Sequence, residues 1–322
     1  MKKSILLYIS AAIIASAFIV ASVKATSTTS CLKTEEECAV NQQITSPYIP
    51  DNIEFCGQSI NLLLIGNREQ FDREVTAFTY GHSTTLLIFK RANRYFPIIE
   101  KILKEEEVPD DFKYLAVVET MLNIRAVSSA KAAGLWQFME GTAKDYGLEV
   151  TSEVDQRYDI ELSTRAACQY FKKAYEDFGD WSTVAAAYNA GKNRLNNDLE
   201  KQQGENFFDL WLPEETMRYV FRILAIKQIM THPKTYGFIL KEEDFSPSIQ
   251  ESIIEINTPI NWVELAQKYG LTYAQLRASN VWIRDLTLTN RMNKTYRVNI
   301  PNKADFKYDC ARIKVHDSNW IK

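Results

Sequence analysis

A glutamate occupies the apolar face of a predicted helix, where a surface acid is not expected. Glu119 shares the spacing i, i+3, i+7 and i+10 with three apolar residues, namely Phe112, Leu115 and Leu122, and this spacing defines one face of a helix. Burial disfavours the charged carboxylate and raises its pKa. A carboxyl group that keeps its proton near neutral pH can serve as a general acid. The alternative is a structural glutamate, paired with Arg125 or placed at a helix edge.

Three further segments bring polar or aromatic side chains that can bind a substrate. Gly134 and its small neighbours allow close approach of the backbone, and Gln137 offers both donor and acceptor groups. Tyr188 and Asn189 lie at the C-terminal end of a predicted helix, and Tyr219 lies in a later one. Taken singly, each segment has a structural interpretation: a packing alanine-rich helix, a core tyrosine near a helix stop, and a packing aromatic.

The composition argues against nucleic-acid and metal chemistry. The chain of 322 residues is 46% hydrophobic with a formal net charge of -3, so it can build a sizeable core and lacks the basic footprint of a nucleic-acid partner. Its three histidines, His82, His232 and His316, are scattered, and its cysteine spacings match no zinc pattern. We therefore expect no metal, no cofactor and no nucleic acid.

The N-terminus has the order of a secretory signal. Two lysines precede an almost uncharged stretch from Ile5 to Val23, and the sequence Val23-Lys24-Ala25 then predicts cleavage after Ala25. An uncleaved membrane anchor is the alternative, because the stretch approaches the length that spans a bilayer. No leucine-rich lipobox runs into Cys31. Either way we expect export to the periplasm or cell envelope, where five cysteines can form disulfides in a pairing that the sequence leaves open.

The apolar spacing predicts a predominantly α protein with a small βααβ module. Helical periodicity with short polar breaks marks the central region, and a helix is expected to open at Pro213 with two acids in its first turn. The predicted organisation is a signal or anchor in 1–25, a polar arm or linker in 26–82, a catalytic domain in 83–243, the module in 250–302 and a C-terminal tail in 303–322.

Four segments together carry a family resemblance. In chain order they are Glu119, Gly134-Leu-Trp-Gln137, Ala187-Tyr-Asn189 and Glu215-Thr-Met-Arg-Tyr219-Val220. This set resembles the lytic murein transglycosylases with a goose-lysozyme-like fold, and it is most similar to their membrane-bound D type. The resemblance covers about residues 95–235 and implies a lysozyme-like helical catalytic domain.

The resemblance implies roles position by position. Glu119 matches the family's catalytic acid and base, and Tyr219 matches the tyrosine that orients it. The other positions match residues that bind or orient substrate, with the two aromatic ones lining the sugar cleft: Ser128, Trp136, Gln137, Tyr188 and Asn189.

Departures from the family pattern are limited. Thr120 stands where serine usually follows the glutamate, and Asn193 replaces a frequent glycine. Three further positions lack prolines that are common in the family: Ile124, Ser129 and Glu140. None of these changes removes a catalytic group, so activity is still expected.

The implied activity is cleavage of the β-1,4 bond between MurNAc and GlcNAc in peptidoglycan glycan strands. Ordinary glycosidases use two carboxylates, whereas a lytic transglycosylase uses one, because the C6 hydroxyl of the substrate attacks in place of water. Residues 253–301 resemble a divergent LysM unit, which implies binding of GlcNAc-containing glycans; a structural appendage is the alternative. Two other functions stay open: a muramidase in which Asp155 or Asp159 activates water, and a non-catalytic peptidoglycan-binding scaffold.

Overall fold

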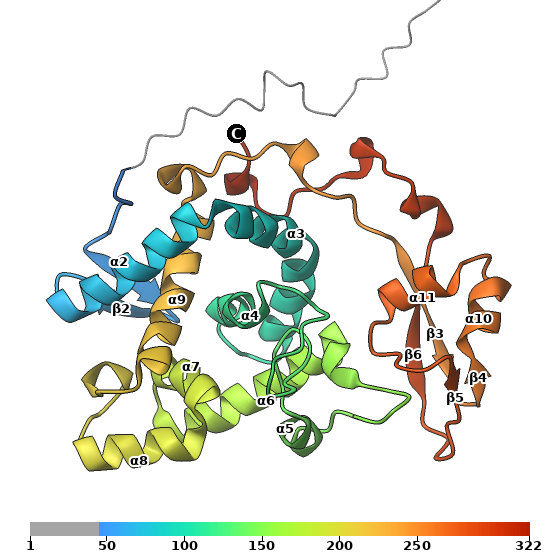
Figure 1. Ribbon diagram of the computed structural model, residues 1–322, viewed down its shortest axis with the longest axis horizontal. Coiled ribbons are helices and arrows are strands. Elements are labelled where there is room, and N and C mark those ends of the chain that lie inside the picture. Colours follow the sequence, from blue (N-terminus) through green and yellow to red (C-terminus); the bar gives the residue numbers. More distant parts are fainter. Residues whose placement is uncertain (1–44) are drawn as a thin grey trace, which may run out of the picture. The chain divides into compact units, whose positions relative to one another are not determined.

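The computed structural model describes residues 45–322. The predicted signal or anchor, and the first part of the predicted arm, lie outside the described residues. Within them the chain is predominantly helical and ends in a small module with strands (Figure 1). This confirms the predicted fold class.

The expected arm or linker up to residue 82 is wrong for its second half. Residues Asn52–Phe55 (β1) and Gln58–Asn61 (β2) form an antiparallel hairpin, and Ile65–Tyr80 form helix α2. Phe71 and Val75 of α2 are fully buried, and α2 packs against α9 (Glu214–Thr231). Polar residues dominate α2, so its sequence alone indicates its buried face only weakly.

The central region is a set of helices joined by short connections. The opening of α9 directly after Pro213, with Glu214 and Glu215 in its first turn, confirms the predicted helix start. The elements between residues 82 and 231, including 3-10 helices labelled η, are α3 (His82–Glu105), η2 (Asp110–Phe112), α4 (Lys113–Thr120), α5 (Glu140–Asp145), η3 (Gln156–Tyr158), α6 (Ile160–Phe178), α7 (Trp181–Ala190), α8 (Lys192–Gln202), η4 (Phe207–Asp209) and α9.

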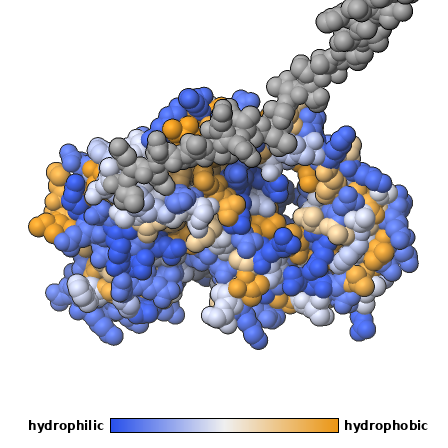
Figure 2. Space-filling model, turned by 45° about the horizontal axis from the view of Figure 1, so that its top comes forward, coloured by the Kyte–Doolittle hydropathy of each residue, from blue (hydrophilic) through white to orange (hydrophobic). Residues whose placement is uncertain are grey.

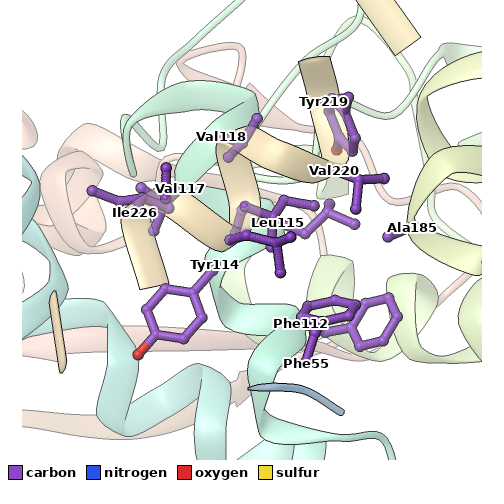
Figure 3. Packing of buried hydrophobic residues seen from close by; sticks show 14 of the residues in the cluster. Phe55, Phe112, Tyr114, Leu115, Val117, Val118, Ala185, Tyr219, Val220 and Ile226 are labelled. Atoms are coloured by element: carbon purple, nitrogen blue, oxygen red, sulfur yellow. The ribbon is translucent and has the colours of Figure 1, made fainter. Parts of the chain in front are cut away.

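Helix α4 lies in the middle of the main hydrophobic core. It packs against α3 and α9, and α7 packs against α6 and α9. Figure 3 shows Leu115 of α4 among side chains from neighbouring elements, with Phe55 and Phe112 close together and Val220 beside it. Leu115 and Phe112 are fully buried, and each contributes about 1.5–3 kcal/mol of hydrophobic stabilisation. The helix that carries Glu119 is therefore fixed from several sides.

The C-terminal module has the predicted strand, helix, helix, strand order. Strands β3 and β6 pair antiparallel, with Ile254 opposite Val298. A second short pair, β4 with β5, joins the two connecting loops. The bounds are β3 (Glu251–Ile256), β4 (Ile260–Asn261), α10 (Trp262–Lys268), α11 (Tyr273–Ser279), β5 (Thr287–Leu288) and β6 (Tyr296–Pro301).

The last residues return to the helical core instead of trailing away. Trp320, in η9 (Ser318–Trp320), is 2% exposed and packs against Phe89 and Phe96 of α3. Its indole N–H donates a hydrogen bond to the carbonyl oxygen of Met230 over 3.0 Å. The remaining short elements are η5 (Pro233–Tyr236), η6 (Glu242–Asp244), η7 (Lys303–Phe306) and η8 (Cys310–Arg312).

The surface is mixed in character. The face drawn in Figure 2 is mostly hydrophilic and carries several separate hydrophobic patches. Between residues 45 and 322, no helix is long and apolar enough to cross a membrane. The disulfide pairing stays open, because Cys31 and Cys38 lie outside the described residues.

Candidate active site

Glu119 lies in the last turn of α4, immediately before a strained turn. Met121 and Leu122 both have left-handed backbone, with φ of 53° and 57°, and each such non-glycine residue costs about 1–3 kcal/mol. Leu122 is fully buried, so its packing holds the turn in place. Strain that the surrounding core enforces in this way is common at functional sites.

The Glu119 carboxyl group is held by one defined partner. The hydroxyl of Tyr219, on α9, donates a hydrogen bond of 2.5 Å to its Oε1 atom. The side chain is partly open to solvent, but the carboxyl lies deep among protein atoms. Desolvation raises its pKa to about 7, although the Tyr219 hydrogen bond and the positive charge of Arg222 pull the pKa down. Glu119 can therefore hold a proton near neutral pH, as the sequence predicted.

A loop with unusual backbone packs beside the glutamate. Gly134 has φ of 77° and Gln137 has φ of 49°. The Gln137 amide donates 2.8 Å to the carbonyl of Gly134, and the Thr120 hydroxyl donates 3.3 Å to the carbonyl of Leu135. Thr120, which stands where the family usually has serine, keeps a hydroxyl, and this hydroxyl joins the end of α4 to the loop.

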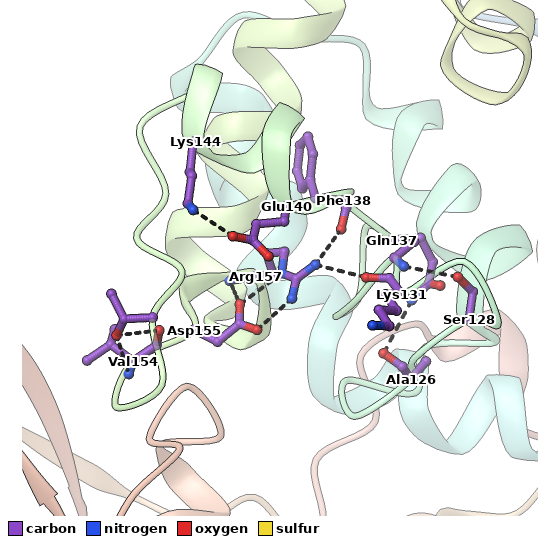
Figure 4. A network of polar contacts seen from close by, with 12 residues as sticks. Ala126, Ser128, Lys131, Gln137, Phe138, Glu140, Lys144, Val154, Asp155 and Arg157 are labelled. Atoms are coloured by element: carbon purple, nitrogen blue, oxygen red, sulfur yellow. Dashed lines mark hydrogen bonds and ion pairs between the residues drawn. The ribbon is translucent and has the colours of Figure 1, made fainter.

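Arg157 anchors the same loop from the other side (Figure 4). Its guanidinium donates to the carbonyls of Lys131 and Phe138, over 3.0 and 3.1 Å, and these residues bracket the loop. Asp155 holds the guanidinium with two hydrogen bonds of 2.8 and 2.9 Å. Only glycine fits at position 134, because a Cβ atom there would lie 1.8 Å from the carbonyl oxygen of Arg157.

Tyr188 joins α7 to the loop. Its hydroxyl donates 2.6 Å to the carbonyl of Trp136. Burial, and secondly the negative charge of Glu119, raise the pKa of Tyr188 well above its ordinary value, so it is a neutral donor. Asn189 lies partly exposed at the end of α7, next to Tyr188. Tyr188 and Tyr219 thus approach Glu119 from two different helices.

Two clefts border the region of the glutamate. One, of about 360 Å³, is lined by Gln137, Phe138, Met139, Thr142, Tyr170, Tyr188 and residues 191–194. The other, of about 620 Å³, lies between α2 and α9 and includes Met121 of the strained turn. These clefts give room for an extended ligand.

Two of the expected sugar contacts need correction. The Trp136 ring does not line a cleft, because it is fully buried and donates 2.9 Å to the Thr164 hydroxyl. The Ser128 hydroxyl accepts a hydrogen bond of 3.0 Å from the backbone of Ala132. In this structure it shapes the loop instead of contacting Glu119.

The two acids suspected as a second catalytic group have structural partners. Asp155 is 6% exposed and both its carboxylate oxygens bind Arg157. Asp159 caps α6, accepting 2.9 Å from the backbone of Leu162, and burial raises its pKa to about 6. Neither is arranged as a solvent-exposed base.

Sequence reasoning missed Arg157, Arg222 and Glu215. The last two act electrostatically on the Glu119 carboxyl, Arg222 lowering its pKa and Glu215 raising it. A signal did exist for this pair, because they flank Tyr219 at helical spacing on α9. Arg157 pairs locally with Asp155, but the loop carbonyls that it binds are 19 and 26 residues away, so no local pattern indicated its contact with the loop. Within residues 45–322, no group of three or more His, Cys, Asp or Glu side chains is arranged to hold a metal ion.

The described helical core carries Glu119, whose pKa is raised and whose carboxyl accepts a hydrogen bond from Tyr219. Residues 96–210 match the family described as the transglycosylase SLT domain. Residues 252–304 match the soluble lytic transglycosylase C-terminal LysM-like domain. The chain therefore contains a transglycosylase SLT domain followed by a LysM-like domain.

Among curated proteins, the chain is similar to membrane-bound lytic murein transglycosylase D of Escherichia coli K12. The two are 32% identical over 226 residues, which is 69% of this chain and 49% of that protein. The chain is also similar to a putative tributyltin chloride resistance protein of an Alteromonas species. These two are 31% identical over 106 residues, which is 33% of this chain and 51% of that protein. The chain spans about half the length of these curated relatives.

Among solved structures, the chain is similar to the 70 kDa soluble lytic transglycosylase of Escherichia coli. The TM-score is 0.41 at 24% identity, covering 53% of this chain and 31% of that one. An inactive mutant of the lytic transglycosylase Slt from Pseudomonas aeruginosa gives a TM-score of 0.37 at 23% identity, covering 44% and 24%.

Proposed function

We propose that this chain is a lytic transglycosylase that cuts peptidoglycan between MurNAc and GlcNAc. One observation carries the proposal: Glu119 has a pKa raised to about 7 and accepts a short hydrogen bond from Tyr219. The match of residues 96–210 to the transglycosylase SLT domain supports it. The substrate follows from the same match and from the LysM-like domain.

A single carboxyl group suffices for the proposed reaction. Protonated Glu119 donates its proton to the glycosidic oxygen as the bond from that oxygen to C1 of MurNAc breaks. The 2-acetamido carbonyl oxygen of MurNAc shares the positive charge that develops at C1, with Asn189 as the expected polar support. The Glu119 carboxylate then accepts the proton of the C6 hydroxyl, and O6 bonds to C1. The products are a 1,6-anhydroMurNAc end and a free GlcNAc hydroxyl, with no water consumed.

Hydrolysis by a second acid has less support. Such a muramidase needs a carboxylate that activates water. The carboxylate of Asp155 is fully engaged by Arg157, and Asp159 caps a helix. A non-catalytic scaffold would not need a glutamate kept protonatable at neutral pH. Cleavage of the glycosidic bond with formation of a 1,6-anhydro ring is therefore the function that the site favours.

Digestion of purified sacculi tests the proposal. We expect wild type to release muropeptides with anhydro ends, which mass spectrometry finds one water lighter than the same muropeptides with reducing ends. We expect Glu119→Gln to lower the rate of release by about 10²- to 10⁴-fold. The matched control is Glu140→Gln, which removes an exposed carboxylate paired with Lys144 and leaves the rate unchanged. Oxygen from labelled water at the new ends would show a muramidase. Binding without any release would show a scaffold.

We further propose that the N-terminal segment directs export of the enzyme, which then works in the cell envelope. This segment is either a signal that is cleaved off or an anchor that stays in the membrane. The order of charged, apolar and small residues in 1–25 supports this. The LysM-like domain is proposed to bind the same glycan. Binding of the Glu119→Gln protein to sacculi, competed by soluble GlcNAc oligomers, measures that contribution.

A further inference from the structure

The loop around Gly134 (residues 126–138) is fixed from one side by residues 149–158, which form the connecting segment between α5 and α6. In this segment Arg157 is 8% exposed, and its guanidinium donates hydrogen bonds to two carbonyls of the loop (Figure 4). The Asp155 carboxylate binds the same guanidinium. A buried guanidinium that is engaged by a carboxylate and two carbonyls is held in one geometry, so the loop follows the position of the connecting segment.

The C-terminal module binds the connecting segment through its backbone. Residues 153–155 lie antiparallel to residues 282–284 of the module, with a β-bridge between Val154 and Ile283 and backbone hydrogen bonds of 2.9 and 3.0 Å beside it. Val154 is 1% exposed and Ile283 is 0% exposed. Paired backbones of this kind keep a fixed register, so a shift of the module at this pairing displaces the segment that holds Arg157.

Side chains of the module hold other points of the connecting segment. The carboxylate of Glu149 accepts hydrogen bonds from the Tyr296 hydroxyl over 3.1 Å and from the Lys294 ammonium over 3.0 Å. The carboxylate of Glu153 accepts 2.8 Å from the Thr289 amide and 3.1 Å from its hydroxyl. Exposed pairs of this kind contribute little each. The buried backbone pairing is therefore the main contact.

The loop also touches the hydrophobic cluster of the module. Ala133, at the base of the loop, is 1% exposed and belongs to the cluster that contains Val154 and Ile283. Its backbone forms a β-bridge with Phe138, and this bridge closes the loop. The loop is thus held both by Arg157 and by the cluster that the module builds.

The loop in turn reaches the site of the proposed chemistry. Gln137 and Tyr188 line the same cleft. The carbonyl of Leu135 accepts a hydrogen bond of 3.3 Å from the hydroxyl of Thr120, the residue next to Glu119. Contacts therefore run without a break from the module to the end of α4, which carries Glu119.

We propose that the C-terminal module positions the loop around Gly134 for catalysis, through the pairing of residues 153–155 with 282–284 and through Arg157. Arg157 is then a positioning residue for Gln137. The inference rests on the proposed function and gives the module a role besides glycan binding. A module that only binds glycan raises the local concentration of substrate and so lowers KM. A module that holds the loop in its productive geometry raises kcat.

A variant on the module side of the pairing tests the proposal without changing the loop. Ile283→Ala, made in the whole chain, removes buried apolar surface opposite Val154. We expect kcat on soluble glycan strands to fall about 10- to 100-fold, because a small displacement of the loop misplaces the groups that bind substrate. We expect KM to change by less than about twofold. A raised KM at unchanged kcat would show that the module only binds glycan, and would overturn the proposal.

The matched control is Leu276→Ala, which removes a buried apolar side chain from α11, a helix that packs against α10 and β6. It leaves kcat unchanged. An equal fall in kcat for the two variants would show an effect of module stability alone, and would overturn the proposal. Arg284→Gln weakens the same contact without a cavity, because it removes an exposed guanidinium stacked on Tyr158. It lowers kcat about two- to fivefold.

A double-mutant cycle tests whether the module acts through Arg157. Arg157→Lys keeps the positive charge beside Asp155 but lacks the fork that reaches two loop carbonyls, and it lowers kcat. If both changes act along one series of contacts, Arg157→Lys combined with Ile283→Ala lowers kcat little further than the larger single effect. A combined fall equal to the product of the two single effects would show independent actions, and would overturn the proposal.

Hydrogen exchange separates this proposal from the proposed function, because it needs no cleavage. The amides of Ala133 and Gly134 donate to the carbonyls of Phe138 and Ala126 within the loop. We expect both amides to exchange about tenfold faster in Ile283→Ala than in wild type or Leu276→Ala. This result supports the coupling even if no anhydro ends form. Unchanged exchange in Ile283→Ala overturns the coupling even if the enzyme is a transglycosylase.

Discussion

Opposing influences set the pKa of the Glu119 carboxyl group. Desolvation raises its pKa, and the Tyr219 hydroxyl and the Arg222 charge lower it, with the balance at about 7. The proposed first step needs the protonated form. We therefore expect the proposed activity to be present below about pH 7 and to be lost as the pH rises through the pKa of Glu119.

Tyr219→Phe changes this balance in a known direction. It removes the 2.5 Å hydrogen bond that favours the charged carboxylate, so the pKa of Glu119 rises. We expect the alkaline limb of the kcat/KM profile to move up by about one pH unit. The control is Tyr236→Phe, whose hydroxyl bonds the carbonyl of Tyr48. A limb that stays in place, or moves to lower pH, would contradict the assigned hydrogen bond.

Among the elements, the loop around Gly134 depends most on distant contacts. Gly134 touches the backbone of Arg157, and Arg157 is fixed by Asp155. The Val154–Asp155 segment also pairs with the C-terminal module, since the Asp155 amide donates 2.9 Å to the carbonyl of Trp282. The loop around Gly134 thus contacts one side of this segment, and the module contacts the other.

Gly134→Ala tests the close approach. A Cβ atom at Gly134 would collide with a carbonyl, so we expect a loss of more than about 2 kcal/mol in the free energy of unfolding, measured by urea titration. Gly147→Ala is the matched control. Gly147 has a similar φ of 81° but open space around its Cα atom, so it reports backbone strain alone. Equal losses for the two variants would show that the contact with Arg157 is unimportant.

At the scale of the whole molecule, two contacts connect the C-terminal part of the described chain to the helical region. One is made by the module, and the other by the residues that follow it. Val154 and Tyr158 are buried in one hydrophobic cluster with the module's Trp262 and Trp282. The guanidinium of Arg284 lies 4.6 Å from the centre of the Tyr158 ring. After the module, Trp320 returns to the main core. The LysM-like domain is therefore attached through a shared core, not only through the chain.

We expect residues 45–322 to unfold as one unit. Differential scanning calorimetry should give a single transition, and Trp320→Ala should lower the free energy of unfolding by about 3–5 kcal/mol for all of it. Trp211→Ala is the control, because Trp211 is 89% exposed and its loss should change stability by less than about 0.5 kcal/mol. Two separate transitions, of which Trp320→Ala moves only one, would contradict the shared core.

The sequence alone determined the features that local patterns encode. Helical spacing placed Glu119 on a buried face, Pro213 with its two acids marked the start of α9, and the predicted βααβ module contained β3 and β6. These predictions succeeded because the 3.6- and 2-residue periods are set by the backbone itself. The four motifs also placed Tyr219 beside the glutamate, through the resemblance they carry.

Only the tertiary structure decided which side chains meet across long stretches of chain. It buried Trp136, engaged Asp155 with Arg157, folded residues 52–80 into the core, and placed the charge of Arg222 where it acts on Glu119. No local pattern contains this information, because such contacts depend on how distant elements pack. The sequence therefore predicted Glu119 as a candidate acid, whereas it did not predict the two clefts that border the region of Glu119.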